Sequence, residues 1–294
     1  MRTVTRGPAV PAAFAAALLT ALAARAGEAA PRRPAERLGP PPPPRPARVV
    51  SLAPSLTDTV LALGEGARLV GVTRYDTAPA VKDLPRVGGF LDPSPEVVLG
   101  LRPDLVLWLT DAGAWPAVRR IAELGVPVLA IPVVGVPDVL ASARLVGEAL
   151  GAPEAGERLA RSLGAAVADA ERRAASLPRR RVLIVIGRDP LVVAGPGSYP
   201  DALLRIAGGE NVVRGDRPWP VYALERAVAD DPELVLDAAV NEPPETVLRL
   251  SAIPAVRAGR VVRLPDDRVL RPGPELPRAL AELLSAVHPE AARP

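Results

Sequence analysis

The chain has 294 residues, of which 49% are hydrophobic and 23% charged, so it can bury one large core or two smaller ones. Its formal net charge of +3 equals the charge of Arg2, Arg6 and Arg25, because the first 26 residues contain no acidic residue. Residues 27–294 therefore sum to zero, and they show no clustered basic stretch of the kind that binds nucleic acid.

The first residues have the pattern of a secretory signal peptide. Arg2 and Arg6 precede an apolar run over 12–24, and a small-x-small cleavage pattern follows at Ala24–Ala26. The run is shorter than the ~20 apolar residues that a membrane-spanning helix needs. The pattern therefore predicts a signal peptide over residues 1–26 rather than a membrane anchor.

The chain contains no cysteine. An exported chain of this composition has no disulfides and no thiolate metal site, and it lacks the cysteine to which a bacterial lipoprotein attaches its lipid. We therefore expect the mature protein to be free in the periplasm.

Residues 27–47 form a proline-rich segment that includes "PRRPAERLGPPPPPRPA". Such composition favours an extended linker, and we interpret it as a spacer before folded sequence that begins at Arg48.

Residues 48–152 alternate between strands and helices. "RVVSLAP" reads as a buried strand, after which Ser55 is placed to cap a helix with Asp58 three residues on. Alternation of this kind predicts a parallel sheet covered on both faces, which makes an N-terminal lobe. Further strands are expected at 68–73, 105–109 and 127–132, and further helices near 95–101, 115–124 and 137–150.

A long amphipathic helix is expected over 153–178, where apolar residues recur at spacings of three and four. The alternation then resumes over 179–294, the C-terminal lobe, where Ser198 and Asp201 repeat the spacing of Ser55 and Asp58. Strands are expected at 181–187, 234–238 and 261–264, and helices near 244–251 and 275–287.

One stretch of the first lobe occurs again in the second. "SPEVVLGLRPDLVLW" at 94–108 aligns with "ALERAVADDPELVLD" at 223–237, so that Glu96 falls on Glu225 and Pro103 on Pro232. The repeat and the long helix together predict an α/β protein of two similar lobes with central parallel sheets, joined by one helix.

Several stretches resemble the substrate-binding proteins of ABC importers for cobalamin, haem and iron–siderophores, with the cobalamin-binding branch the nearest. They are "RVVSLAPSLTDTVLALG", "LPRVGGFLDPSPEVVLGLRPDLVL", "GSYPDALLRIAGGENVV" and "RPGPEL", and the resemblance extends over about residues 48–287. It implies two Rossmann-like lobes on a helical backbone, with cobalamin held in the cleft between them. It also implies a monomer without a cofactor of its own, which delivers its ligand to an inner-membrane permease dimer and its ATPase subunits.

The same resemblance gives the repeated glutamates a role. Glu96 and Glu225 match the surface glutamates that engage arginines on the permease subunits, a contact that carboxylates make well. The alternative is that each glutamate only stabilises the start of its helix through the helix dipole, because Ser94 and Pro95 already provide a cap and a first residue.

By resemblance, Phe90 and Trp219 match aromatic ligand contacts and Asp267 matches a polar one. Rings of this kind bind flat, largely apolar macrocycles such as corrins and porphyrins. Tyr75 and Trp108 are expected either to contact the ligand as well or to pack in the core. The chain departs from the branch at Thr77, Leu109 and Arg268, where aromatic residues would be expected, and Trp115 is a further core candidate.

The range of possible ligands is narrowed by residue types that the chain lacks. Its sole histidine, His288, is expected to lie outside the lobes, and its sole methionine is Met1, so haem is left only a tyrosinate as side-chain ligand. No cluster suited to a free metal ion is apparent. A ferric siderophore would need convergent arginines, for which the candidates are Arg74, Arg86, Arg188 and Arg268.

The remote alternative to a substrate-binding protein is an exported hydrolase. "AGPGSYP" holds Ser198 between glycine and tyrosine, but Pro196 and Pro200 replace the glycines of a nucleophile elbow. Because no histidine is placed as a base and no cysteine as a nucleophile, we expect a binding protein rather than an enzyme.

Overall fold

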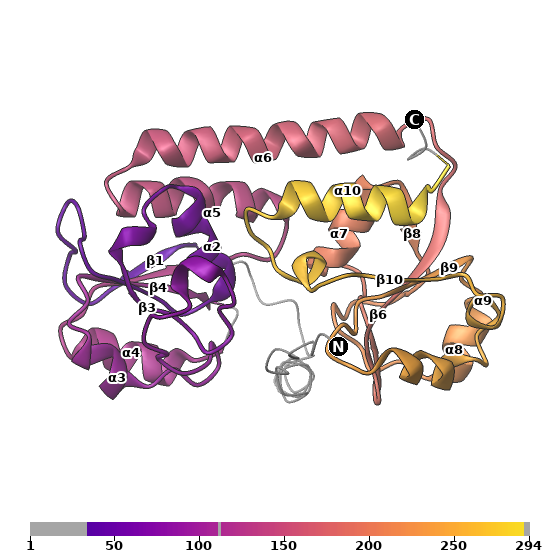
Figure 1. Cartoon of the computed structure of the whole chain (residues 1–294), viewed down its shortest axis with the longest axis horizontal. Coiled ribbons are helices and arrows are strands. Elements are labelled where there is room, and N and C mark those ends of the chain that lie inside the picture. Colours follow the sequence, from indigo (N-terminus) through magenta and orange to yellow (C-terminus); the bar gives the residue numbers. More distant parts are fainter. Residues whose placement is uncertain (1–33, 111–112, 291–294) are drawn as a thin grey trace, which may run out of the picture. The chain divides into compact units, whose positions relative to one another are not determined.

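The computed structural model describes residues 34–110 and 113–290, which form two compact α/β units (Figure 1). The N-terminal unit holds the described residues up to Arg172 together with 271–280, and the C-terminal unit holds 173–270 and 281–290. The two α/β units confirm the expected fold class. The predicted signal peptide lies outside the described residues.

The N-terminal unit contains a five-stranded sheet in the order β1-β5-β4-β2-β3. All neighbours in this sheet are parallel except β1, which is antiparallel to β5, so the sheet is mixed. Its central strands are apolar on both faces because helices cover both faces. The strands are β1 (Glu36–Leu38), β2 (Val49–Ser51), β3 (Leu69–Gly71), β4 (Leu105–Leu109) and β5 (Val128–Ile131).

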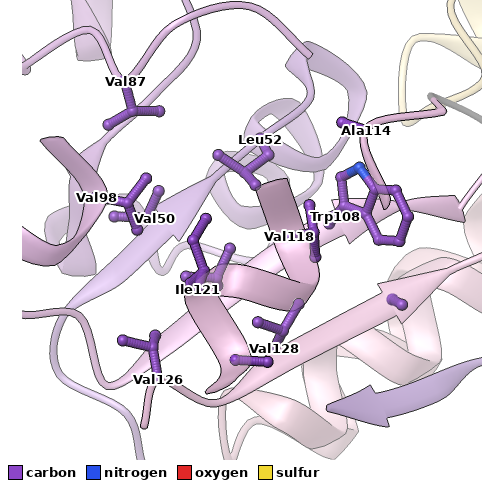
Figure 2. Packing of buried hydrophobic residues seen from close by; sticks show 13 residues of the cluster. Val50, Leu52, Val87, Val98, Trp108, Ala114, Val118, Ile121, Val126 and Val128 are labelled. Carbon is purple, nitrogen blue, oxygen red and sulfur yellow. The ribbon is translucent and has the colours of Figure 1, made fainter. Parts of the chain in front are cut away.

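Helices α2 and α5 lie over one face of this sheet, and α3 and α4 lie over the other (Figure 1). Val118 and Ile121 of α4 pack against Trp108 and Val128 of the strands in one buried cluster (Figure 2). The helices are α2 (Pro54–Ala62), α3 (Pro95–Gly100), α4 (Trp115–Glu123) and α5 (Val136–Ala149), with 3-10 turns at Gly66–Arg68 and Pro79–Val81.

The prediction that Ser55 caps α2 is wrong. The helix begins at Pro54, whose fixed φ suits a first helical position, and Ala53 is the N-cap. Ser55 is therefore buried inside the first turn. Asp58 does not form a capping bond at this helix; its Oδ2 lies 3.7 Å from Arg271 Nη1.

The interpretation of the proline-rich segment as a spacer is also wrong for its described part. Glu36–Leu38 forms β1 in register with β5, and Leu38 packs against the core cluster. Pro46 is buried, and its carbonyl accepts a bond from Arg68 Nη1 at 3.2 Å. Proline cannot donate to a sheet, but its carbonyl remains available to side-chain donors. Residues 34–47 thus belong to the N-terminal unit.

The C-terminal unit contains a second mixed sheet in the order β10-β9-β6-β7, with β8 paired to β6. The long strand β6 pairs with β8 near its start and with antiparallel β7 near its end. Ser198 caps α7 and accepts the N–H of Asp201 at 3.3 Å, so this Ser-x-x-Asp spacing marks a cap where that of Ser55 and Asp58 does not. The strands are β6 (Arg180–Arg188), β7 (Leu191–Val193), β8 (Gly209–Asn211), β9 (Leu234–Asp237) and β10 (Val261–Arg263).

Helices α7 (Tyr199–Ile206), α8 (Leu224–Ala229) and α9 (Pro254–Arg257) belong to this unit, as do residues 281–287 of α10 (Leu276–Val287). Residues 244–250 form a 3-10 helix instead of the expected α-helix. Its Thr246 N–H bonds to the carbonyl three residues earlier, at Pro243, over 3.0 Å. A further 3-10 turn lies at Arg268–Leu270.

The expected long helix is α6 (Pro153–Ala174), whose 22 residues correspond to a length of ~33 Å. It crosses α5 closely, because a Cβ on Gly156 would lie only 2.7 Å from the carbonyl oxygen of Ala143. The boundary between the two units falls between Arg172 and Arg173, near the end of this helix.

The sequence repeat is a structural repeat. Helix α3 precedes β4 in one unit, and α8 precedes β9 in the other. Between helix and strand, Arg102 and Asp231 occupy matching positions and both have positive φ, 47° and 39°. Such backbone is costly for residues other than glycine, so its recurrence shows that both units make the same turn before the proline.

Candidate functional site

The candidate ligand residues of the N-terminal unit lie on two loop segments that are bonded to each other. The segment leaving β3 pairs with the segment entering α3: Val87 donates its N–H to Val72 O at 2.9 Å, and Arg74 donates to Gly88 O at 2.8 Å. These bonds bring Tyr75 beside Phe90, although neither residue belongs to a regular element.

Tyr75 and Phe90 form an aromatic pair. Their ring centroids are 6.0 Å apart with an interplanar angle of 65°, and both side chains are half-buried. Edge-to-face pairs are a favourable arrangement of aromatic rings. Gly89 packs against the Tyr75 ring of the pair, because a Cβ there would be 2.9 Å from Tyr75 Cε2. The two rings therefore form a supported aromatic surface, which we call the aromatic pair below.

A buried carboxylate closes the turn that carries Tyr75. Asp76 is 5% exposed, and its Oδ2 accepts the N–H of Thr73 at 2.8 Å and the Thr73 hydroxyl at 2.5 Å. Burial raises the pKa of Asp76, and hydrogen bonds from Thr73 and Thr57 oppose this rise. Asp76 was not among the predicted site residues, although the Thr-x-x-Asp spacing from Thr73 to Asp76, which encloses Tyr75, would have indicated it.

Trp108 is in the core and not at the surface. Its side chain is 0% exposed within the cluster of Figure 2, and its ring packs edge-on against Trp115 with centroids 4.6 Å apart. Of the two readings open for Trp108, the structure favours packing. A buried ring of this kind contacts no ligand without a rearrangement of the core.

Trp219 lies in the C-terminal unit, on a loop fixed at both sides of the residue. Gly195 donates to Pro218 O at 2.8 Å, and Val193 of β7 donates to Pro220 O at 3.2 Å. A Cβ on Gly195 would lie 2.0 Å from the carbonyl oxygen of Arg217, so glycine is required for this close approach. The Trp219 side chain itself is half-buried.

Asp267 also lies in the C-terminal unit and is half-buried. Its carbonyl accepts the N–H of Leu270 at 2.8 Å and so supports the 3-10 turn that follows. Contact of Trp219 and Asp267 with a ligand stays a prediction that rests on the family resemblance.

The four arginines considered for a siderophore have partners of their own. Arg74 Nη2 binds Asp92 Oδ2 at 2.5 Å, and Arg86 donates to the carbonyl of Thr73 at 3.2 Å. Arg188 is 0% exposed in its side chain, and Arg268 Nε donates to Asp266 Oδ1 at 2.8 Å. Of the four, Arg74 also lies over a ring of the aromatic pair, with Cζ 5.6 Å from the Tyr75 centroid.

The repeated glutamates are both exposed, each at the second residue of its helix. At α3, Ser94 is the N-cap and its hydroxyl donates to Glu96 Oε2 at 3.1 Å. At α8 the N-cap is Ala223, and no side chain caps the helix. Local capping thus involves Glu96 more than Glu225, and permease docking stays a prediction for both.

His288 was expected outside the lobes, and this expectation is wrong. The residue is 0% exposed, because α10 carries the chain end into the C-terminal unit. A Cβ on Gly208 would lie 2.9 Å from His288 Nε2. Over the described residues, no group of three or more histidine or acidic side chains could hold a metal ion. Within the same residues, no helix is long and apolar enough to cross a membrane.

Comparison with known proteins identifies the family. Residues 49–268 match the family described as periplasmic binding protein. The chain belongs to this family. Among solved structures, the apo form of the periplasmic heme-binding protein RhuT from Roseiflexus sp. RS-1 superposes with a TM-score of 0.75 at 32% identity, over 84% of this chain and 99% of that one.

Two relatives are similar along most of their length. The uncharacterized ABC transporter substrate-binding lipoprotein YvrC of Bacillus subtilis (strain 168) is 29% identical over 255 residues, 83% of this chain and 81% of the relative. The vitamin B12-binding protein of Pectobacterium carotovorum subsp. carotovorum (strain PC1) is 27% identical over 249 residues, 82% of this chain and 88% of the relative. This chain is accordingly a substrate-binding protein of the ABC importer family that the sequence resembles.

Proposed function

We propose that this protein is the periplasmic substrate-binding component of an ABC importer and that its ligand is a corrinoid. It would deliver the corrinoid to an inner-membrane permease dimer with its ATPase subunits. The observation that carries the ligand class is the aromatic pair: Tyr75 and Phe90 are half-buried, their ring centroids are 6.0 Å apart, and Gly89 packs against Tyr75. Rigid rings bind the apolar parts of a macrocycle at low entropic cost.

The residue types that bind haem iron in other proteins are mostly buried or hydrogen-bonded in this chain, which supports a corrinoid rather than haem. His288 is fully buried, and the single methionine is Met1 in the predicted signal peptide. Of the three tyrosines, Tyr199 is 3% exposed and the Tyr222 hydroxyl donates to Asp230 Oδ2. Tyr75 is therefore the tyrosine that haem iron would need, and its side chain is itself in contact with the Arg74 guanidinium.

Haem remains the second candidate because of one observation. RhuT, the solved structure at 32% identity, is named as a heme-binding protein, whereas the vitamin B12-binding relative is 27% identical. Both similarities extend over more than four fifths of this chain, so identity alone does not rank the two ligands.

Substitution of Tyr75 by phenylalanine separates the two ligands. The phenylalanine keeps a ring beside Phe90 but removes the only oxygen proposed for haem iron. If the ligand is a corrinoid, calorimetry should show one-to-one binding of cyanocobalamin to residues 27–294, with an affinity in Tyr75→Phe within about threefold of the wild type. Absence of cyanocobalamin binding, together with a haemin absorption band that Tyr75→Phe abolishes, would overturn the proposal in favour of haem.

A further inference from the structure

An ion pair between Arg74 and Asp92 lies beside the aromatic pair. Stacking of a macrocycle on the two rings does not by itself require this ion pair. The Arg74 guanidinium lies over the Tyr75 ring, with Cζ 5.6 Å from the centroid, and Nη2 binds Asp92 Oδ2 at 2.5 Å. The two side chains remain 47% and 63% exposed, so the pair is accessible to solvent. An accessible pair of this kind adds little to stability.

The position of the guanidinium is set by the backbone beneath it. A Cβ on Gly89 would lie 2.4 Å from Asp92 Oδ1, 2.9 Å from Tyr75 Cε2 and 3.5 Å from Arg74 Cζ. The backbone N–H of Arg74 is bonded to Gly88 O at 2.8 Å. Charge and ring therefore pack against one glycine, and the cation lies over one ring of the aromatic pair.

We propose that Arg74 recognises a negatively charged group at the periphery of the macrocycle that packs on Tyr75 and Phe90, an inference that rests on the proposed function. A guanidinium has five N–H donors, and the contacts with Asp92 and Tyr75 engage only part of them, so Arg74 retains donors for a second anion. Asp92 holds the guanidinium over Tyr75 while no ligand is bound. The pKa of Arg74 is raised, chiefly by its hydrogen bond to Asp92, so the group stays charged.

The anion that Arg74 would bind is a phosphodiester or a carboxylate. Cobalamin carries a phosphodiester on its nucleotide side chain, whereas haem carries propionates. Arginine binds both groups through charge-assisted hydrogen bonds. Two ligand pairs separate these sources: cyanocobalamin against dicyanocobinamide, which lacks the phosphodiester, and haemin against its dimethyl ester, which lacks the charged propionates.

The test compares each ligand pair in the wild type, Arg74→Gln and Arg74→Lys. Arg74→Gln should weaken the charged member of the recognised pair by about five- to tenfold and leave the uncharged member nearly unchanged. Arg74→Lys should retain most of the preference, because it keeps the charge. Arg119→Gln is the matched control, since Arg119 lies 5.4 Å over the ring of Trp115 in the same unit, and it should change neither affinity.

Asp92→Asn distinguishes recognition from loop support. If Arg74 recognises an anion, Asp92→Asn should keep or increase the preference for the charged ligand, because a competing carboxylate is removed. If the ion pair only supports the loops, both Arg74→Gln and Asp92→Asn should weaken charged and uncharged ligands alike, and the inference is then wrong. A wild type that binds none of the four ligands contradicts the proposed function as well. Binding with an unchanged preference in Arg74→Gln contradicts the Arg74 inference alone.

Discussion

Arg188 and Asp237 form an ion pair inside the C-terminal unit, at the ends of the neighbouring strands β6 and β9, with side chains 0% and 2% exposed. Arg188 also donates to Pro243 O at 2.9 Å and to Thr246 Oγ1 at 2.6 Å. Buried charges of this kind are tolerated only while their partners are present. The pair therefore stabilises this unit, and Arg188 is not the siderophore contact for which its sequence made it a candidate.

Removal of Asp237 should leave the buried Arg188 charge without its nearest carboxylate, with only Glu242 Oε2, 3.7 Å from Nη1, remaining as an ionic partner. We expect Asp237→Ala to lower the free energy of unfolding by about 3–5 kcal/mol in urea denaturation. The exposed pair of Arg249 and Asp189, with side chains 60% and 75% exposed, provides the control. Asp189→Ala should cost at most about 1 kcal/mol. Equal losses in the two variants would show that burial of Arg188 carries no special cost.

Gly89→Ala tests the close packing of Gly89 against Tyr75 and Asp92. The new Cβ would lie 2.4 Å from Asp92 Oδ1 and 2.9 Å from Tyr75 Cε2, so both side chains must move. We expect ligand affinity to fall by about two- to tenfold, the effect of forcing a side chain off its rotamer. In Gly100→Ala, where nothing lies within 4 Å of the new Cβ, calorimetry should give wild-type affinity. Equal affinity in both variants would exclude the aromatic pair from the ligand contact.

Trp219 and Trp108 should respond in opposite ways to truncation. Trp219 is half-buried on a loop, so Trp219→Ala should weaken ligand binding by about 1–3 kcal/mol with little effect on the melting temperature. Trp108 is 0% exposed, so Trp108→Ala should cost about 3–5 kcal/mol of stability. Calorimetry and thermal unfolding on both variants measure the contrast. A folded Trp219→Ala with unchanged affinity would remove Trp219 from the proposed contacts.

Charge reversal of Glu96 and Glu225 tests permease docking. Both side chains are exposed in the first turn of their helices, so the double reversal to arginine should cost only about 0.3–1 kcal/mol of stability per site. Uptake in cells with the cognate permease should collapse, because like charges would then face each other across the interface. Glu171→Arg, at an exposed site of α6, should transport normally. Normal uptake by the double variant would reduce both glutamates to helix-start residues.

Tyr222 should make the protein sensitive to alkaline pH. Burial, with the hydrogen bond to Asp230, raises the pKa of Tyr222 to about 12. An unfolded tyrosine titrates near ~10, so between these values the folded state holds a proton that the unfolded state has lost. The contribution of Tyr222 to stability is therefore complete below pH ~10 and is lost as the pH rises toward 12. Tyr222→Phe should flatten this decline in urea denaturation, and an identical slope would contradict the assignment.

The sequence by itself determined most regular elements of the N-terminal unit and the family. The strand expected at 105–109 is Leu105–Leu109, and the helix expected near 95–101 is Pro95–Gly100. This strand and this helix were predictable because their signals, namely periodicity, a serine cap and a following proline, depend only on residues close together in the chain. The repeat of α3–β4 in α8–β9 was visible for the same reason.

Only the tertiary structure decided which aromatic rings are accessible. Trp108 and Phe90 are similar in chemistry, yet one is 0% exposed beneath α4 and the other is half-buried beside Tyr75. Periodicity did not reveal that Leu38 joins the core through β1 or that Asp92 meets Arg74. The physical reason is that burial and pairing depend on segments distant in the chain. A local pattern records the residue's own preference but not the partner that the fold brings to it.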